Sequence, residues 1–417
     1  MIRSKGKGKI SLVKLTVKCL IVVSLLATFT GLSFGAERPA QFPERIILNL
    51  TADPAHSMAV TWRTNDINTK TVARILPANA AVKLVPAEPN IVGVSEVINP
   101  KNDSVAIRCH SVVFKNLQPN TFYNYQVGDG NVWSEWSQFK TASDKSEPFS
   151  FLFFGDPQNQ LVEYVSRVFR QAYRAVPTAA FGIITGDLVT DPRNDDEWRD
   201  FYYAAGWIPR EMPFVMVPGN HEYYDGADYR TVTPLWRPQF TLPENGLRQL
   251  AETSYFVDYQ GLRLVCLNGN IYMEEQAVWL DSLLSTTSAD WIVLAFHQPL
   301  YNTGTTDRDN EKARKLYEPI FAKYQVDLVL QGHDHVYGRS YPIVNGKIAE
   351  KGVKGTVYVV SVSGPKSYAM NSKFTDKFVK MGTGQQLYQV IKVCPKELDY
   401  RCYTTAGELY DSFTLEK

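Results

Sequence analysis

Cysteine is scarce in this chain, which has five cysteines among 417 residues. Cys19 lies in the amino-terminal segment, and the spacing of the other four does not match a metal site. In an oxidising compartment Cys394 and Cys402 could form a disulfide across a short turn, whereas free buried thiols are the alternative for Cys109 and Cys266. A metal site in this chain would therefore have to be built from other side chains.

An excess of one charge sign is also missing, because 44 lysines and arginines balance 43 aspartates and glutamates. We therefore do not expect nucleic acid or an anionic membrane surface as a partner. The chain is 44% hydrophobic and 21% charged, which is ordinary for a folded globular protein and argues against disorder. A length of 417 residues favours two or three folded units.

A long apolar run is missing from the amino terminus. Residues 1–36 begin with six lysines and arginines, continue with the short apolar run from Leu20 to Ala27, and end with Gly35 and Ala36. A membrane-spanning helix needs about twenty apolar residues, so this pattern indicates a secretory signal peptide instead. We expect a secreted or periplasmic protein that begins near Glu37 and is not inserted in a membrane after signal cleavage. Its charge balance would be 38 minus 43, about −5.

Two patterns of secondary structure divide the remaining chain. Residues 40–142 show short alternating strands separated by turns, a pattern that predicts an all-β sandwich, and the stretch from Leu117 to Tyr125 resembles a turn of fibronectin type III domains. In residues 149–417 apolar strands alternate with amphipathic helices, which predicts an α/β domain. The expected strands are 58–62, 105–107, 111–114 and 123–127 in the first part, and 149–154, 181–185, 214–217, 262–267, 292–296, 327–330 and 357–362 in the second.

Four of the six histidines fall in an ordered set of short motifs, each within a few residues of the end of an expected strand. The motifs are Gly155-Asp156-Pro157-Gln158, Gly186-Asp187, Gly219-Asn220-His221-Glu222, Phe296-His297 and Gly332-His333-Asp334-His335. Open α/β sheets gather ligand sites at the carboxyl ends of their strands, so we expect these residues to converge. Carboxylates, amides and imidazoles suit two divalent metals with open water positions, and Asp187 is the candidate bridge.

An aspartate or asparagine after glycine is usually a turn or helix-cap residue, and that interpretation would be preferred for any one motif alone. The order of all five argues against it. His56 and His110 have no partner motif, so we expect both to be structural or solvated. Asp334 alternates away from the ligand face, which places it behind the ligands or at the surface.

With these motifs in this order, the sequence resembles the calcineurin-like metallophosphoesterases, and within them the purple acid phosphatase branch. That branch has a fibronectin-like domain before a catalytic domain of four layers, α/β/β/α. The resemblance implies two sets of metal ligands, the first being Asp156, Asp187 and His335 and the second Asp187, Asn220, His297 and His333. It also implies that His221 contacts the substrate phosphate beside Asn220 and protonates the leaving group after attack by a metal-bound hydroxide.

Three features depart from the pattern of the purple acid phosphatases or of other metallophosphoesterases. Thr190 stands where that branch has the tyrosine that ligates ferric iron and gives the colour, so we expect no ferric-tyrosinate absorption and divalent Mn, Zn or Fe instead. Gln158 stands where other metallophosphoesterases have a histidine, and it is a candidate, weaker metal ligand. A further substrate-binding histidine is missing after the His297 motif, and Arg308 is a candidate replacement on grounds of charge.

The sequence therefore predicts a fibronectin-like sandwich followed by an α/β metallophosphoesterase domain. The expected activity is dinuclear metal-dependent hydrolysis of a phosphorylated small molecule, with phosphomonoesters ahead of phosphodiesters. The alternative from another class is a phosphate- or glycan-binding surface protein that has kept the fold and lost turnover, which Thr190 and Gln158 would favour. In a third interpretation the sandwich is an adhesion module.

Overall fold

The computed structural model describes residues 40–87, 89–100, 106–223, 231–305 and 310–417. The expected signal peptide at residues 1–36 lies outside these ranges. Within them, no helix combines the length and the apolar character that crossing a bilayer requires.

The amino-terminal part is a sandwich of two antiparallel sheets, as predicted. One layer holds β1 (Glu44–Asn49), β2 (Met58–Asn65), β6 (Ile107–Phe114) and β5 (Val94–Ile98), and the other holds β4 (Ile91–Val92), β3 (Val72–Pro77), β7 (Phe122–Gly128) and β8 (Ser137–Lys140). Aromatic rings fill the space between the layers: Phe114 of β6 lies 5.8 Å from Tyr125 of β7 and 6.0 Å from Phe139 of β8, measured between ring centroids.

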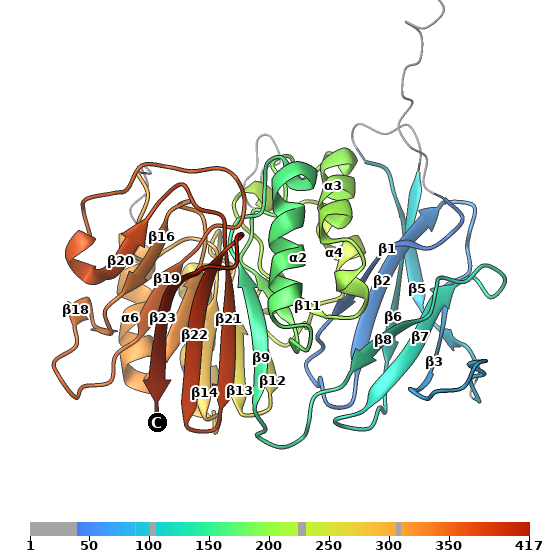
Figure 1. Ribbon diagram of the computed structural model, residues 1–417, viewed down its shortest axis with the longest axis horizontal. Helices are drawn as coiled ribbons and strands as arrows, with labels where there is room; N and C mark the ends of the chain where they lie inside the picture. Colours follow the sequence, from blue (N-terminus) through green and yellow to red (C-terminus); the bar gives the residue numbers. More distant parts are fainter. Residues whose placement is uncertain (1–39, 88, 101–105, 224–230, 306–309) are drawn as a thin grey trace, which may run out of the picture. The chain divides into compact units, whose positions relative to one another are not determined.

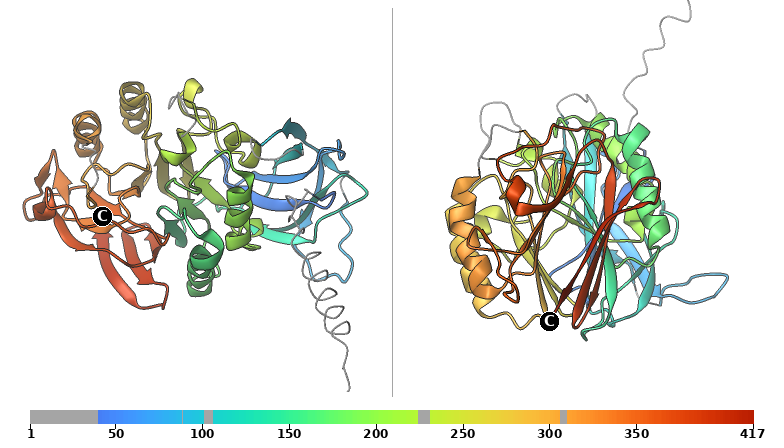
Figure 2. Two further views of the ribbon diagram at one scale, coloured as in Figure 1. Left: turned by 90° about the horizontal axis from the view of Figure 1, so that it is seen from above. Right: turned by 60° about the vertical axis from the view of Figure 1, so that its left-hand side comes forward.

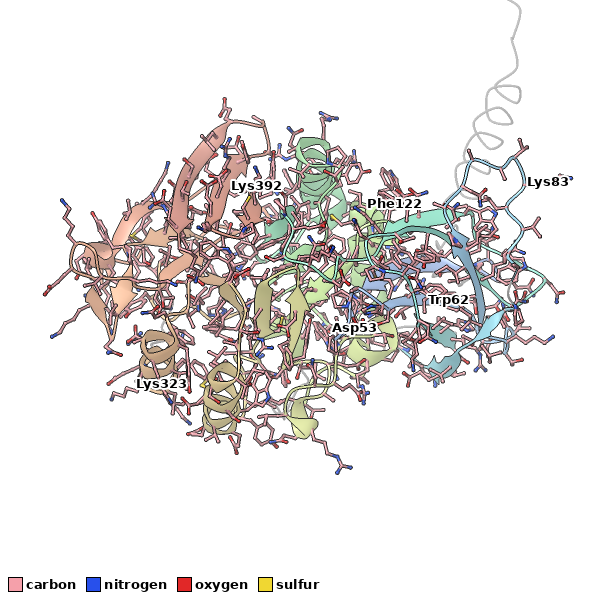
Figure 3. The ribbon with its side chains drawn as sticks, turned by 90° about the horizontal axis from the view of Figure 1, so that it is seen from below. Asp53, Trp62, Lys83, Phe122, Lys323 and Lys392 are labelled. Carbon is pink, nitrogen blue, oxygen red and sulfur yellow. The ribbon has the colours of Figure 1, made fainter. Side chains whose placement is uncertain are left out.

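The strand prediction for this part needs one correction. The sequence predicts separate strands at 105–107 and 111–114, whereas the structure has the single strand β6 from Ile107 to Phe114. The intervening residues Arg108, Cys109 and His110 include none of the residue types that make turns, so nothing interrupts the ladder with β2. His110 is buried and stacks on Trp62 (labelled in Figure 3), with ring centroids 5.1 Å apart.

The main sheet runs through both parts of the chain, a feature that the sequence did not predict. Its ten strands have the order β23-β22-β21-β9-β10-β11-β1-β2-β6-β5 (Figure 1). The carboxy-terminal part, residues 149–417, supplies β9 (Phe149–Phe154), β10 (Gly182–Ile184), β11 (Phe214–Met216), β21 (Leu387–Cys394), β22 (Glu397–Thr404) and β23 (Leu409–Glu416). The junction is the parallel pair β1 and β11, where Asn49 lies opposite Phe214 and donates a side-chain hydrogen bond to its carbonyl oxygen over 2.9 Å.

A second, seven-stranded sheet belongs to the carboxy-terminal part alone. Its order is β12-β13-β14-β15-β19-β16-β20, with bounds Tyr255–Tyr259, Leu262–Cys266, Trp291–Ala295, Leu328–Gln331, Val357–Val360, Tyr337–Ser340 and Phe378–Gly382. The two sheets pack through aromatic side chains, and the ring of Phe149 on β9 lies 4.7 Å from that of Tyr259 on β12. A hairpin of β17 (Ile343–Val344) and β18 (Lys347–Ile348) stands apart from both sheets.

Helices cover the outer faces of the two sheets. The turn at Leu161–Val165, helix α2 (Ser166–Ala175) and helix α3 (Asp195–Ala205) pack together, as do α5 (Met273–Ser285) and α6 (Glu311–Tyr324). The right-hand view of Figure 2 shows the sheets between these two groups of helices. This is the four-layer α/β/β/α arrangement that the family resemblance implies. The short helix α4 (Trp236–Gln239) contacts β2 and β6 of the sandwich.

The described cysteines are all free thiols, so the disulfide considered for Cys394 and Cys402 is not formed. The two residues lie on neighbouring strands but not opposite each other, because Cys394 pairs with Glu397 and Cys402 pairs with Gln389. Cys109 and Cys266 are buried, in agreement with the alternative interpretation of buried thiols.

Candidate metal centre

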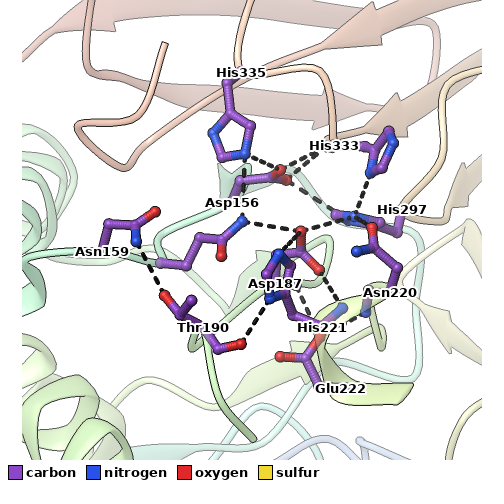
Figure 4. Close-up of polar contacts among 12 residues, drawn as sticks. Asp156, Asn159, Asp187, Thr190, Asn220, His221, Glu222, His297, His333 and His335 are labelled. Carbon is purple, nitrogen blue, oxygen red and sulfur yellow. Dashed lines mark hydrogen bonds and ion pairs between the residues drawn. The ribbon is translucent and has the colours of Figure 1, made fainter. Parts of the chain in front are cut away.

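The predicted ligands meet where the carboxyl ends of strands from both large sheets come together (Figure 4). From the ten-stranded sheet come the residues that follow β9, β10 and β11, and from the seven-stranded sheet those that follow β14 and β15: Asp156, Asp187, Asn220, His297, His333 and His335. Parallel strands point their carboxyl ends the same way, which explains how distant segments supply one centre.

Two of the motif glycines are needed because the carboxylates lie against their backbone. A Cβ atom on Gly219 would lie 2.1 Å from Asp187 Oδ1, and one on Gly332 would lie 2.0 Å from Asp156 Oδ1. No real Cβ contact is that short, so any larger residue would push the carboxylate out of position. Gly332 follows a strand of one large sheet and Asp156 a strand of the other, so this glycine allows the two sheet edges to approach closely at the centre.

Four of the expected ligands have backbone conformations that residues with a side chain rarely adopt. The φ angles are 32° for Asp156, 51° for Asp187, 71° for His333 and 49° for His335. Left-handed conformations of this kind cost free energy and concentrate at functional sites, where the surrounding structure holds them in place. This clustering supports the functional interpretation of the five motifs over ordinary turns.

The side chains form two buried ligand groups that share one carboxylate. Asp156, Asp187 and His335 offer ligand atoms within 4.8 Å of one another, and so do Asp187, His297 and His333. Asn220 joins the second group, because its Oδ1 lies 3.1 Å from His297 Nε2. Asp187 therefore occupies the bridging position that the sequence analysis gave it.

Hydrogen bonds from outside the groups fix the orientation of the ligands. His297 Nδ1 lies 2.7 Å from the carbonyl oxygen of Thr185, so Nδ1 carries the proton and Nε2 faces the carboxylate of Asp187 at 3.2 Å. The buried carboxylate of Glu222 accepts hydrogen bonds from the backbone N–H groups of Asp187 and Gly219, over 2.8 and 2.7 Å. Glu222 thus ties two ligand loops together, and such outer contacts orient the ligands of metal sites.

Asp334 lies between two ligand histidines but does not point to the centre. It is buried, and its Oδ2 accepts hydrogen bonds from the backbone N–H groups of Thr303 and Gly304, over 2.5 and 3.0 Å. Asp334 therefore holds the loop that follows the His297 motif, which is a supporting position behind the ligands.

Burial and crowding of charge perturb most of the titratable groups at the centre. Burial raises the pKa of Asp156 well above its usual range, and the neighbouring Asp187 adds to this effect. Burial acts the same way on Asp187, but the nearby imidazoles, led by His297, hold its pKa below the ordinary value. Burial would lower the pKa of His297, yet the two carboxylates raise it to about 10. Burial and the positive charge of Lys366 lower the pKa of His335 to about 3.

These residues fit a pair of divalent cations. Two carboxylates are buried side by side, an arrangement that is costly until positive charge compensates it. Within the described part of the chain, the buried atoms Gln158 Oε1 and His335 Nδ1 also have no hydrogen-bond partner. Carboxylate and neutral imidazole groups are the donors that Zn, Mn and ferrous Fe accept, so the donor set suits the ions expected from the sequence.

Gln158 lies inside the first ligand group. Its side chain is fully buried, and its Nε2 lies 3.1 Å from Asp187 Oδ2 and 3.3 Å from His335 Nε2. Rotation of the amide about its last bond would place the unpaired Oε1 between the same two ligands. The structure therefore brings Gln158 to the position that a weak oxygen ligand of the first metal would take.

Thr190, at the position of the expected tyrosine, makes its side-chain contact away from the ligands. Its hydroxyl accepts a hydrogen bond from Asn159 Nδ2 over 3.1 Å. Its backbone has the more direct connection to the centre, because the carbonyl oxygen lies 2.7 Å from His221 Nδ1. A hydroxyl on so short a side chain supplies no phenolate, so the structure offers no tyrosinate from this position.

His221 lies beside the bridging carboxylate and belongs to neither ligand group. Its backbone N–H donates a hydrogen bond to Asp187 Oδ1 over 2.9 Å, and its Nε2 lies 3.9 Å from Asp187 Oδ2. The side chain is 22% exposed, whereas that of Asp187 is 2% exposed. His221 is therefore the imidazole at this centre that a substrate can reach from solvent.

Several residues of the centre were not predicted from the sequence. Arg308 lies outside the described residues. Lys366 and Tyr368 follow strand β19, and the ring of Tyr368 lies 5.1 Å from that of His335. Their position after a strand end was the available signal, but no motif marks it. The carbonyl groups of Thr185 and Thr190 are backbone atoms, for which no sequence signal exists.

A buried pair of ligand groups with one shared carboxylate is the arrangement of a dinuclear metallohydrolase. The sequence profile of calcineurin-like phosphoesterases matches residues 149–337, and that of the purple acid phosphatase N-terminal domain matches residues 43–141. The chain belongs to the calcineurin-like metallophosphoesterases and carries an N-terminal domain of the purple acid phosphatase type.

Three similar proteins place the chain within this family. Acid phosphatase type 7 of Homo sapiens is 27% identical over 363 residues, which cover 79% of this chain and 77% of the human protein. An uncharacterized protein of Mycobacterium tuberculosis is 26% identical over 327 residues, and the match covers 69% of this chain but only 60% of the mycobacterial protein. The structure of a purple acid phosphatase from yellow lupin seeds has the same fold, with a TM-score of 0.76, 19% identity, and coverage of 90% of this chain and 74% of the lupin chain.

Proposed function

We propose that this protein hydrolyses phosphate monoesters with two divalent metal ions, and that phosphodiesters are its second substrate class. The observation that carries the proposal is the place of Asp187, which belongs to both ligand groups while His221 lies beside it on the solvent side. The names of the human and lupin relatives, which are acid phosphatases, support monoesters as the first choice.

The side chains divide into ligands and groups that contact the substrate. Asp156, Asp187 and His335 would hold one ion, with Gln158 as an additional weak ligand. Asp187, Asn220, His297 and His333 would hold the other. Two such ions, when bound, lower the pKa of a water molecule and offset the charge that develops on the phosphate oxygens.

His221 is the group that can move a proton. Its Nδ1 donates to the carbonyl oxygen of Thr190, so Nε2 carries a proton only when the ring is an imidazolium. In that form Nε2 can bind a phosphate oxygen and then donate its proton to the departing alkoxide. The side-chain amide of Asn220, on the preceding residue, is placed to assist in holding the phosphate.

The donor set supports a choice among the possible ions. Without a phenolate at position 190 the first ligand group has no special preference for ferric iron, so we propose Mn, Zn or ferrous Fe and a colourless protein. The unpaired Gln158 Oε1 in that group supports this choice, because a neutral amide oxygen adds no charge to compensate a trivalent ion.

The experiment measures bound metals and turnover on the same preparation. The purified protein, supplied in turn with Mn, Zn and Fe, is assayed with an aryl monophosphate and with a bis-aryl phosphodiester. We expect two metal equivalents per chain and faster turnover of the monoester. Two bound metals without turnover of either ester would contradict the proposal and favour a non-catalytic phosphate-binding protein.

A further inference from the structure

A small basic groove opens beside the metal centre. Its cavity has a volume of about 230 Å³ and lies between the start of helix α2 and the loops that follow β19 and β20. Two cationic side chains, Arg167 and Lys366, line it together with neutral polar residues. The described lining contains no aspartate or glutamate, so Arg167 and Lys366 are the charged groups that face the groove.

The groove adjoins the first ligand group through the loop that carries Lys366. The backbone N–H of Gly364 donates to the carbonyl oxygen of Asp156 over 2.9 Å, and a Cβ atom on Gly364 would lie 2.6 Å from that oxygen. Two residues after Lys366, the ring of Tyr368 packs edge-on against that of His335, and Lys366 Nζ lies 5.2 Å from the Tyr368 ring centroid. The same loop therefore borders both the metal centre and the groove.

Hydrogen bonds at both ends hold this loop in place. At one end the N–H of Ser363 donates to the carbonyl oxygen of Gly155 over 2.6 Å. At the other, the hydroxyl of Thr383 donates to the carbonyl oxygen of Tyr368 over 2.6 Å. Since the backbone on either side of Lys366 is fixed, the ammonium group is restricted to the neighbourhood of the groove, and binding an anion there costs less ordering entropy.

Neither cation has an acidic partner within the part of the chain that the structure describes. Among the described residues, Arg167 makes its side-chain hydrogen bonds to the neutral amide oxygen of Gln386, with Nε at 3.0 Å, and Gln386 in turn donates to the carbonyl oxygen of Ser363 over 2.8 Å. The ammonium of Lys366 rests near the ring of Tyr368 instead of a carboxylate. Without a carboxylate partner among the described residues, both groups are available to bind an anion from outside.

We propose that the basic groove binds a second phosphate group of the substrate while the metal centre holds the phosphate that is hydrolysed. This proposal rests on the proposed hydrolysis of phosphate esters. The preferred substrates of the protein would then be small molecules with two phosphate groups. The groove volume of about 230 Å³ has room for one phosphate group with water around it. A phosphoanhydride and a bisphosphate ester share this chemistry.

The reaction balances as an ordinary hydrolysis. The oxygen of a water molecule forms a bond to the phosphorus held at the metal centre, and the bond from that phosphorus to the leaving oxygen breaks. The leaving oxygen keeps the electron pair and takes a proton from His221, while the attacking water releases one proton to solvent, from which His221 regains its own. The products are orthophosphate and a compound that retains the phosphate bound in the groove.

The test compares matched substrates that differ by one phosphate group. One pair is a nucleoside diphosphate and its monophosphate, and the other is a hexose bisphosphate and its monophosphate. We expect kcat/KM to be at least about tenfold higher for the two-phosphate member of one pair, which is the range of a charge-assisted hydrogen bond. A gain in the first pair assigns a phosphoanhydride, and a gain in the second assigns a bisphosphate ester.

Charge-removing variants connect that preference to the groove. Lys366→Gln and Arg167→Gln should each lower the two-phosphate to one-phosphate ratio of kcat/KM by about tenfold. The matched controls are Arg174→Gln, on the last turn of α2, and Lys392→Gln, opposite Ser150 at the far end of β9 (Figure 3). Calorimetry supplies a readout besides turnover, because methylenediphosphonate should bind more tightly than methylphosphonate and lose about tenfold in affinity in Lys366→Gln.

The outcomes separate the inference from the proposed function. Equal kcat/KM within both substrate pairs, or a ratio that changes no more in Lys366→Gln than in Lys392→Gln, overturns the inference while monoester turnover remains. Absence of monoester turnover in the metal-loaded protein overturns the proposed function, and calorimetry then tests phosphate binding in the groove by itself. Equal affinity for methylenediphosphonate and methylphosphonate overturns the proposed binding of a second phosphate group.

Discussion

The imidazole of His221 is held by the backbone of Thr190, with Nδ1 lying 2.7 Å from the carbonyl oxygen. Thr190 departs most clearly from the purple acid phosphatase pattern. It is connected to the centre through its backbone carbonyl group, which any residue at this position would have. Loss of the tyrosine changes the ligands available to the first metal and leaves the orientation of the proton donor intact. The two properties can therefore be tested separately.

Replacement of His221 by Ala should lower kcat most for esters with poor leaving groups. General acid catalysis contributes about 10²–10⁴-fold, and an alkoxide needs the proton more than a nitrophenolate does. We expect kcat to fall about a thousandfold for an alkyl phosphate and much less for p-nitrophenyl phosphate. Metal content should not change, because His221 belongs to neither ligand group. Equal losses on both esters would assign His221 to phosphate binding alone.

Replacement of Gln158 by His should strengthen metal binding at the first ligand group. Imidazole binds Mn, Zn and ferrous Fe more strongly than an amide oxygen does, and Gln158 already lies 3.3 Å from His335 Nε2. Competition with a chelator should show slower loss of one of the two metals in Gln158→His and faster loss in Gln158→Ala. Identical metal retention in the two variants would show that position 158 contributes no ligand.

Removal of the metals should destabilise the protein. Ions that bind the folded chain alone stabilise it by about 2.7 kcal/mol at a hundredfold excess over Kd, and they also compensate the buried pair Asp156 and Asp187. We expect the melting temperature to fall after dialysis against a chelator and to recover when Mn or Zn is added. In Asp187→Asn, which loses the shared ligand, the added ion should restore little. A melting temperature that does not change after treatment with the chelator would contradict a metal centre of this kind.

Replacement of Asp195 by Asn should loosen the junction between the sandwich and the carboxy-terminal part. Asp195, at the start of α3, accepts hydrogen bonds from Arg45 and Arg63 of the sandwich over 2.7 and 2.6 Å, and all three side chains are at most 15% exposed. Loss of one partner from a buried ion pair costs about 3–5 kcal/mol, which denaturant unfolding can measure. The matched control is Asp196→Asn, because that side chain is 62% exposed and its ion pair among the described residues is with Arg199, so its cost should stay within about 1 kcal/mol.

The sequence predicted the candidate site better than it predicted how the two parts join. Strand ends could be located from apolar runs followed by glycine, and the shared polarity of parallel strands then placed Asp156 and His335 at one edge. The pairing of β1 with β11 joins Asn49 to Phe214, and a contact between such distant segments leaves no local pattern. Lys366 was overlooked for a related reason: a lone lysine after a strand has no motif, and its importance appears only when the groove beside it is seen.

Acid should destabilise the sandwich through His110. The ring is buried against Trp62, its nitrogens lie 2.8 and 2.7 Å from the hydroxyls of Thr64 and Thr71, and burial together with the charge of Arg108 lowers its pKa to about 4. An unfolded histidine has a pKa of about 6.5, so between these two values the unfolded chain binds a proton that the folded chain does not. The contribution of neutral His110 to the free energy of unfolding is therefore fully present above pH 6.5. It is lost as the pH falls toward 4, by up to about 3 kcal/mol.

The variant His110→Gln keeps a donor and an acceptor for the two threonines but cannot titrate. We expect it to be less stable than the natural protein near pH 7 and to lose less stability between pH 6.5 and 4, so that the two unfolding curves converge in acid. His56→Gln is the control, because His56 is exposed and lies 3.0 Å from the carboxylate of Asp53. If the difference in unfolding free energy between His110→Gln and the natural protein were constant across this range, the protonation of His110 would not be the cause.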